Sequence, residues 1–214
     1  MKTKTKALAL ALCAVLLVVS TVFVTMAYLT SKTDVVTNTF TVGKVTITLD
    51  EADVDLMGVK DGDTRVKANE YKLIPGHTYI KDPTIHVADD SEECWLFVKV
   101  ENGLSAIEAN TSEDLSIAAQ MAAKGWTPVA EGSNIYAYST KQTARANVVV
   151  FDNFTISGTA DVSKYATADG TDAEGNPIGG KTIEVTAYAI QADGFATAAE
   201  AWTAAGAEAQ AKAN

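Results

Sequence analysis

The sequence predicts an all-β chain that folds as a jelly-roll-like β-sandwich, with one or two short helices in a connection and at the C-terminus. Three observations predict this class. Apolar residues, many of them β-branched, alternate with polar residues at period two, which is typical of half-buried strands. Turn signals separate these segments at short intervals. Only two segments have helical character, which argues against a parallel sheet with crossover helices.

The first predicted strand lies in residues 38–49, NTFTVGKVTITL. Apolar residues occupy even positions before Gly43 and odd positions after it, so we expect a bulge or bend at Gly43 to restore one buried face. Residues 50–69 are acidic and rich in turn formers. We expect them to form an exposed connection or a short polar hairpin, with Asp61-Gly62 as a turn.

The middle of the chain contains several further strands. Pro75-Gly76 predicts a turn between two strand-like pieces, and residues 81–83 predict an extended break. Residues 94–100, CWLFVKV, are apolar on both faces, which suits a central strand that is covered on both sides. Later strands bring the predicted total to seven or eight, and they lie in residues 134–140, 147–157 and 181–191, the last with Ile183, Val185, Ala187 and Ala189 on one face.

Two segments are predicted to be helical. Residues 112–124 begin with the capping residue Ser112, have an acidic first turn and stop at Gly125. The Ala-rich C-terminal segment places Phe195, Ala199 and Trp202 at helical spacing. We expect this short helix to dock its aromatic residues on the sheet and then to fray.

The N-terminus has the pattern of a secretory signal peptide. Three lysines, at positions 2, 4 and 6, precede residues 7–27, which carry no charge. A permanent membrane anchor is the alternative, because an apolar run of roughly 20 residues can span a bilayer. Thr25 and Ala27 would suit a signal peptidase at the −3 and −1 positions, so the mature chain would begin at Tyr28 and contact the membrane only before cleavage.

Removal of 27 of the 214 residues leaves 187, which is enough for one domain with a substantial core. The 17 Lys and Arg residues fall to 14 against 27 Asp and Glu, so the mature net charge is −13. Nucleic acid and anionic lipid are therefore poor partners. Cys94 is the one cysteine left, and we expect it to be buried in the core and not to act as a nucleophile.

The sequence lacks the common catalytic and cofactor-binding motifs. His77 and His86 lie nine residues apart in or beside predicted strands, and with acidic residues they could in principle hold zinc. We interpret both as outward-facing strand residues. No catalytic residue, metal ligand or cofactor is predicted.

One acidic segment approaches a calcium-binding pattern. Asp53, Asp55 and Gly58 match the first, third and sixth positions of an EF-hand loop. Met57 and Thr64 stand where ligands are required, so we interpret the segment as a solvated acidic face.

Four segments in the same order resemble the TasA/camelysin family of Gram-positive secreted proteins. They read AYLTSKTDVVTNTFTVGKVTITL, YKLIPGHTYIKDPTIHV, CWLFVKV and KTIEVTAYAIQADGF. The resemblance covers both ends of the mature chain, whereas residues 101–180 match only loosely. It implies a jelly-roll domain that is exported with a dedicated signal peptidase of the SipW type.

The family's better-studied members assemble into fibres of the extracellular biofilm matrix. In these fibres the N-terminal segment that cleavage exposes adds as a strand to the neighbouring subunit. Carried onto this chain, the segment is an arm of residues 28–39, with Leu29, Val35 and Val36 as the docking side chains, followed by a sandwich domain of residues 40–214. The expected partners are further copies of the chain in a head-to-tail filament, the signal peptidase and other matrix proteins.

Edge-strand physics agrees with this expectation, because a short terminal arm cannot bury itself but can complete a sheet edge in another copy. Two alternatives remain. The chain could be a monomeric cell-surface adhesin or ligand-binding sandwich, since fold alone does not determine function. It could also be a camelysin-like metallopeptidase, although no motif in the sequence supports that activity.

Overall fold

The computed structural model describes residue 13 and residues 44–165 and 181–205. The chain divides into two units, Met1–Thr41 and Val42–Asn214, and the fold below is that of the second. Several sequence-based predictions lie outside the described residues, namely the cleavage site at Thr25, Ala27 and Tyr28, the arm residues Leu29, Val35 and Val36, and the bulge at Gly43.

The described residues form ten strands, two short α-helices and one 3-10 turn. In chain order these are β1 (Ile47–Val54), β2 (Lys60–Val66), β3 (Thr78–Ile80), β4 (Thr84–Val87), β5 (Cys94–Asn102), α2 (Ile117–Ala123), β6 (Trp126–Pro128), β7 (Ile135–Tyr138), β8 (Asn147–Val149), β9 (Asn153–Thr155), η1 (Val162–Lys164), β10 (Ile183–Gln191) and α3 (Ala198–Ala204). None of the helices among these residues is both long and apolar enough to cross a membrane.

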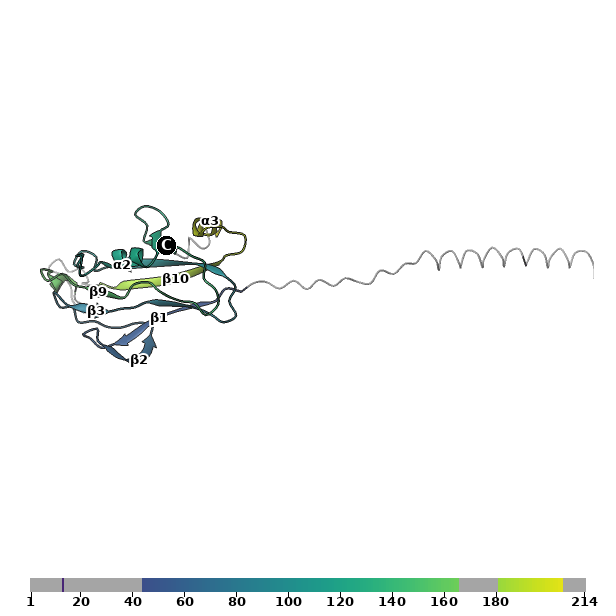
Figure 1. Cartoon of the computed structure of the whole chain (residues 1–214). Coiled ribbons are helices and arrows are strands. Elements are labelled where there is room, and N and C mark those ends of the chain that lie inside the picture. The colour runs from purple at the N-terminus through teal and green to yellow at the C-terminus, as the bar shows by residue number, and fades with distance from the viewer. Residues whose placement is uncertain (1–12, 14–43, 166–180, 206–214) are drawn as a thin grey trace, which may run out of the picture. The chain divides into compact units, whose positions relative to one another are not determined.

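The strands form three antiparallel sheets (Figure 1). One sheet has the order β2-β1-β4-β8, the second β10-β5-β7-β6, and the third pairs β3 with β9. The predicted all-β, sandwich-like class is therefore confirmed, whereas the jelly-roll connectivity stays a prediction.

The main core contains side chains from both four-stranded sheets. Ile85 and Val87 of β4 and Leu96 and Val98 of β5 belong to one buried cluster. The opposite face of β5 places Phe97 against Trp202 of α3, with ring centroids 4.9 Å apart. Because β5 also lies between β10 and β7, the prediction of a central strand covered on both faces is confirmed.

Residues 50–69 contribute to the hairpin of β1 and β2, but they are less exposed than expected, because residues 50–54 continue β1 and Glu51, Ala52 and Val54 are buried. The turn also lies elsewhere than expected. The chain reverses at residues 55–59, and the predicted turn at Asp61-Gly62 lies inside β2. Gly58 has φ +70°, and a Cβ there would come within 2.8 Å of the Tyr79 backbone. Only glycine permits this close approach, so the turn forms around Gly58.

The first predicted helix is shorter than expected. It begins at Ile117 with Ser116 as its N-cap, not at Ser112. The Thr111 hydroxyl accepts hydrogen bonds from the backbone of Glu113 and Asp114, which holds this stretch in a local turn. Gly125, at φ +92°, follows the end of the helix as predicted.

The C-terminal helix docks through its tryptophan, as expected. Trp202 is buried, but Ala199 is exposed and Ala201 occupies the buried position instead. Phe195 lies before the helix, because the cap falls at Thr197. Fraying beyond residue 205 lies outside the described residues.

The predicted total of seven or eight strands was too low. Residues 147–157, expected to form one strand, contribute β8 and β9 to two different sheets. The three-residue strand β6 was missed because it ends in Pro128, a weak strand signal.

Candidate strand-acceptor edge

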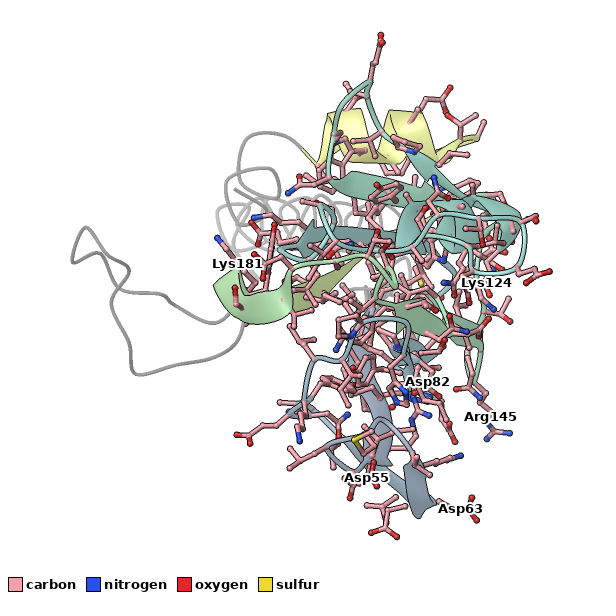
Figure 2. The ribbon with its side chains drawn as sticks, turned by 90° about the vertical axis from the view of Figure 1, so that its left-hand side faces the viewer. Asp55, Asp63, Asp82, Lys124, Arg145 and Lys181 are labelled. Atoms are coloured by element: carbon pink, nitrogen blue, oxygen red, sulfur yellow. The ribbon has the colours of Figure 1, made fainter. Side chains whose placement is uncertain are left out.

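The two large sheets end in four edge strands, and three of them are poor templates for strand addition. β6 and β8 have three residues each. β2 is mostly exposed and carries the charges of Lys60, Asp61, Asp63 and Arg65. Figure 2 shows Asp55 and Asp63 at the projecting end of this hairpin. Short edges and charged edges both discourage pairing with another chain.

The fourth edge strand, β10, has none of these protections. It is nine residues long, contains no Lys, Arg or Pro, and has Glu184 as its one charged residue. All nine residues pair with β5 in unbroken register. Within the described residues, no strand pairs with its other side.

The hydrogen-bond pattern shows which backbone groups of β10 face its open side. Gly103 N donates to Thr182 O at 2.9 Å, and Ala192 N donates to Glu93 O at 2.8 Å. In an antiparallel ladder the bonded residues alternate, so the even-numbered residues of β10 face β5. The odd-numbered residues therefore direct their N–H and C=O groups to the open side, and these are Ile183, Val185, Ala187, Ala189 and Gln191.

Four of these odd-numbered residues were predicted from the sequence to share one apolar face, and their side chains pack against the main core, namely Ile183, Val185, Ala187 and Ala189. Ile183, Val185, Ala187 and Ala189 are only half-buried, whereas Leu96 on the neighbouring strand is fully buried. Val45, Ile47 and Leu49 at the start of the other sheet are half-buried as well, and β1 lies close to β10. The core is therefore thinly covered along the open side of β10.

The chain enters β1 at the same end of the domain where β10 finishes. Lys44 O accepts a hydrogen bond from Glu92 N, and the next residue, Glu93, accepts one from Ala192 N. Lys44 therefore lies beside the C-terminal end of β10.

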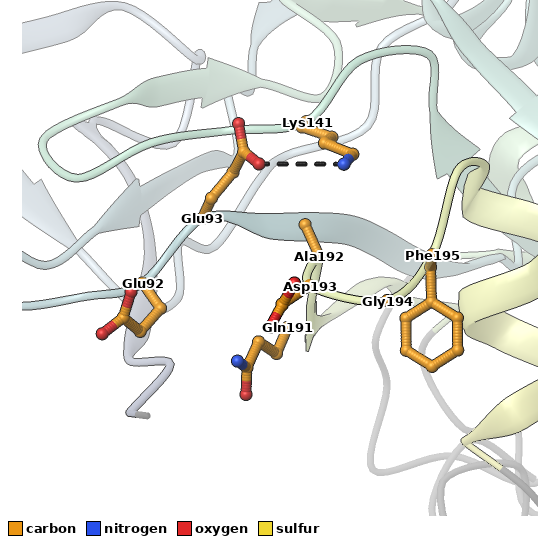
Figure 3. Close-up of a pocket in the computed structure, with 8 residues that line it drawn as sticks. All are labelled: Glu92, Glu93, Lys141, Gln191, Ala192, Asp193, Gly194 and Phe195. Carbon is orange, nitrogen blue, oxygen red and sulfur yellow. Dashed lines mark ion pairs between the residues drawn. The ribbon is translucent and has the colours of Figure 1, made fainter. Parts of the chain in front are cut away.

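A small hollow of about 170 Å³ lies at this end of β10 (Figure 3). Its wall includes Glu92, Glu93, Asp193 and Lys141, and Lys141 Nζ lies 3.8 Å from a carboxylate oxygen of Glu93. The hollow therefore offers charge and little apolar surface.

A second hollow of about 380 Å³ lies at the other end of β5, beside α2. Glu108 in its wall accepts hydrogen bonds from Ile117 N and Asn102 Nδ2, and burial raises the pKa of Glu108. These bonds tie the loop to α2, so this carboxylate has a local structural role.

The two histidines lie in different settings. His86 is on the outer face of β4, where its ring nitrogens lie 2.9 Å from Asp50 and 2.6 Å from Asn147, as the strand interpretation predicted. His77 does not face outward from a strand. It precedes β3, lies 2.8 Å from Met57 O and packs edge-on against Tyr79. The tight turn at Gly58 brings these groups together.

The segment that resembled a calcium loop is the turn of the β1–β2 hairpin. The Asp55 carboxylate accepts hydrogen bonds from Met57 N and Val59 N, each at 2.9 Å, so it serves the turn. Asp53 lies in β1 and Thr64 in β2. The part of the chain that the structure describes has no group of three or more His, Cys, Asp and Glu side chains able to hold a metal ion.

Cys94 is fully buried in the main core, as predicted. Burial and the neighbouring charge of Glu93 raise the pKa of its thiol to about 11. The thiolate form that nucleophilic chemistry requires is therefore disfavoured.

The acceptor edge itself was not identified from the sequence. The alternation of residues 183–189 was the available signal, and it correctly predicted a strand with one apolar face. That this strand lies at the end of a sheet depends on tertiary pairing. No family model, curated protein or solved structure matches the chain.

Proposed function

We propose that the mature chain is a secreted structural protein that assembles into extracellular matrix fibres, in which the arm of one copy adds to β10 of the next. The observation that carries the proposal is the long, unguarded edge of β10 with its half-buried apolar side chains. The resemblance to the TasA/camelysin family supports the same role. The leader would be removed by a SipW-type signal peptidase, and assembly would take place outside the cell.

The direction of the chain favours addition to a neighbour. Lys44 lies beside the C-terminal end of β10, so an arm that paired with β10 of its own subunit would run parallel to it. On a second copy stacked end to end it would run antiparallel to β10, which is the more stable pairing. Such contacts repeat without closing, so they produce filaments.

The two faces of the arm differ. One face has Leu29, Ser31, Thr33, Val35, Thr37 and Thr39 and no side-chain charge, whereas the other includes Lys32 and Asp34. In two paired strands, directly opposed side chains lie on the same face of the sheet. The uncharged face of the arm would therefore lie next to the half-buried side chains of β10 and cover them. Leu29 and Val35 would then be buried. Val36, which the family resemblance also implies as a docking side chain, falls on the other face of a regular strand, so we revise that expectation and propose that Val36 points outward. The arm has 12 residues, or about 40 Å when extended, which is enough to cover the nine residues of β10.

The energy of each contact is modest. Backbone hydrogen bonds contribute on the order of 1 kcal/mol net each. Each apolar side chain that becomes fully buried adds about 1.5 to 3 kcal/mol. These gains must exceed the cost of association and ordering, so assembly should depend on protein concentration.

Electron microscopy of purified protein tests the proposal. A chain that begins at Tyr28 should form filaments, and a chain with extra residues before Tyr28 should form fewer. Val35→Asp should abolish filaments and leave the thermal unfolding of the monomer nearly unchanged. Val36→Asp is the matched control on the outward face and should still assemble.

Two outcomes would contradict the proposal. If Val35→Asp assembles as readily as the parent, the arm does not donate a strand through this face. If Val35→Asp unfolds at a much lower temperature, the arm belongs to the sheet of its own subunit.

A further inference from the structure

Three polar side chains from separate segments meet beside β1, and we call Glu51, Asn69 and Lys81 the buried triad. Glu51 lies in β1 and exposes 5% of its surface, Asn69 follows β2, and Lys81 follows β3. Lys81 Nζ lies 2.6 Å from Glu51 Oε2. Asn69 Nδ2 donates to Glu51 Oε1 at 2.9 Å. One buried carboxylate therefore holds both an amine and a carboxamide.

Glu51 is the buried member of the triad, whereas Asn69 and the neighbouring Tyr71 are half-buried. The Lys81 side chain is 10% exposed, and its Nζ lies 6.0 Å from the centre of the Tyr71 ring. Tyr71 packs edge-on against Tyr79 and Phe154. Along the short Lys81–Glu51 hydrogen bond the Glu51 carboxylate can take a proton from the Lys81 ammonium and leave a neutral amine. A neutral amine is a nucleophile.

The Asn69 side-chain amide is hydrogen-bonded through both its oxygen and its nitrogen. Val54 N donates to its Oδ1 at 3.1 Å, which stabilises negative charge that develops on this oxygen when the carbonyl carbon is attacked. Its Nδ2 donates to Glu51 and also to Ala52 O at 2.9 Å. The leaving nitrogen thus lies next to the group that can protonate it.

We propose that Lys81 and Asn69 become joined by an isopeptide bond, with Glu51 as the proton carrier. Lys81 Nζ attacks Cγ of Asn69, the Nζ–Cγ bond forms, and the Cγ–Nδ2 bond breaks. Of the two protons that the Lys81 ammonium loses, one reaches the leaving nitrogen through Glu51 and the other ends on the released ammonia, which departs as ammonium. Atoms and charge balance without an oxidant or a reductant.

The bond ties the segment after β2 to the segment after β3. It closes a covalent ring over residues 69–81 and replaces a buried ammonium with a neutral amide. A chain whose mature form has one cysteine cannot form an internal disulfide, and this bond supplies a cross-link that reducing conditions do not break. The inference is independent of fibre assembly.

Mass spectrometry of the purified, folded chain beginning at Tyr28 tests the bond. The intact mass should be lower than the sequence mass by one ammonia. Trypsin cleaves after Lys67, Lys72 and Lys99 but not after an acylated Lys81. The digest should therefore contain residues 68–72 linked to residues 73–99, with fragment ions that locate the link at Asn69 and Lys81.

Two variants and one control separate this bond from other losses of ammonia. Lys81→Arg retains the positive charge but removes the amine, and Glu51→Gln retains the shape but removes the proton carrier, so both should restore the full mass. Lys124→Arg alters an ion pair with Asp152 and should still show the loss. A succinimide at Asn102-Gly103 also loses ammonia, but it would persist in Lys81→Arg.

Recovery of residues 68–72 and 73–81 as separate, unmodified peptides from the folded parent chain would overturn the proposal. The buried triad would then be a non-covalent ion pair. This peptide map decides the question even if a variant fails to fold.

Discussion

Among the described residues, β10 and β2 are the two longest edge strands, and they differ in pairing and in charge. β10 pairs with β5 over nine consecutive residues and directs apolar side chains into a thinly covered core. β2 pairs with β1 over a short, interrupted register, with a shift between Ala52 and Val54, and exposes charged side chains along most of its length. β10 is therefore regularly paired and nearly free of charge, whereas β2 is irregularly paired and charged.

The difference supports β10 as the edge that we propose to pair with another copy. Soluble proteins usually protect long edges with charge, proline or irregular pairing, because an open edge is a template for aggregation. β2 and β6 have such protection, and β10 lacks it. A long unprotected edge is tolerable when another strand regularly occupies it, which is the role that we propose for the arm of a second copy.

The largest expected effect comes from blocking β10 directly. Ala187→Pro removes an N–H that points to the open side and forms no bond to β5, so the ladder to β5 stays intact. We expect complete loss of filaments by electron microscopy, with a small fall in the melting temperature of the monomer. Val36→Asp, which should still assemble, is the control for the assay.

Filaments of Ala187→Pro that match the parent in number and length would show that the arm docks elsewhere. Loss of the folded monomer would instead show that β10 cannot accept proline. In that case Val35→Asp, which changes the arm and leaves β10 intact, would test the proposed contact.

A smaller effect is expected on the unfolding free energy of the monomer. It compares β5, whose core side chains are fully buried, with β10, whose core side chains are half-buried. Leu96→Ala removes a fully buried side chain and should cost about 2 to 5 kcal/mol of unfolding free energy in the monomer. Val185→Ala removes two methyl groups that are half-buried, so we expect about 1 kcal/mol. Urea unfolding of both variants measures the difference. Equal costs would mean that the core beside β10 is already closed in the monomer.

The smallest expected effect concerns the attachment of β2. Arg65 of β2 is hydrogen-bonded to Asp50 and to Asp82. These bonds link the irregularly paired strand β2 to β1 and to the segment before β4. Burial alone would raise the pKa of Asp50, but hydrogen bonds from Arg65 and His86 outweigh burial and hold this pKa below its ordinary value of 3.8. The folded state therefore favours the ionised carboxylate.

This stabilisation is fully present above the ordinary pKa of Asp50 and is lost as the pH falls through the lower folded value. The parent should melt at a higher temperature than Asp50→Asn at about pH 7, by the equivalent of about 1 kcal/mol for this partly exposed group, and the gap should narrow at about pH 3. A gap that widens in acid would contradict the sign of the effect.

The sequence was most informative where a strand is long and buried. The double apolar pattern of residues 94–100 correctly predicted a central strand, and the alternation of residues 183–189 correctly predicted an apolar face directed at the core. Period-two patterns are reliable here because burial against both neighbours enforces them.

The sequence was least informative where one contact between distant residues decides the local structure. Asp61-Gly62 has stronger turn chemistry than Leu56-Met57, yet the chain turns at Gly58 because Tyr79 leaves no room there for a side chain. The buried triad unites residues from three segments, and no spacing in the sequence marks it. A local sequence pattern likewise does not show which strand lies at the edge of a sheet, because the order of the strands depends on tertiary pairing.

The burial of Cys94 has a practical consequence for the mature chain. Cys94 is the first residue of the central strand β5, and its backbone is hydrogen-bonded to that of Gln142 on one side and pairs with Gln191 on the other. A thiol-specific reagent can reach the Cys94 thiol only after the sheet separates. The labelling rate of the unmodified protein therefore measures how often the core opens. The same cysteine would report, without any engineered probe, how much more slowly a subunit opens once a neighbour occupies the edge of β10.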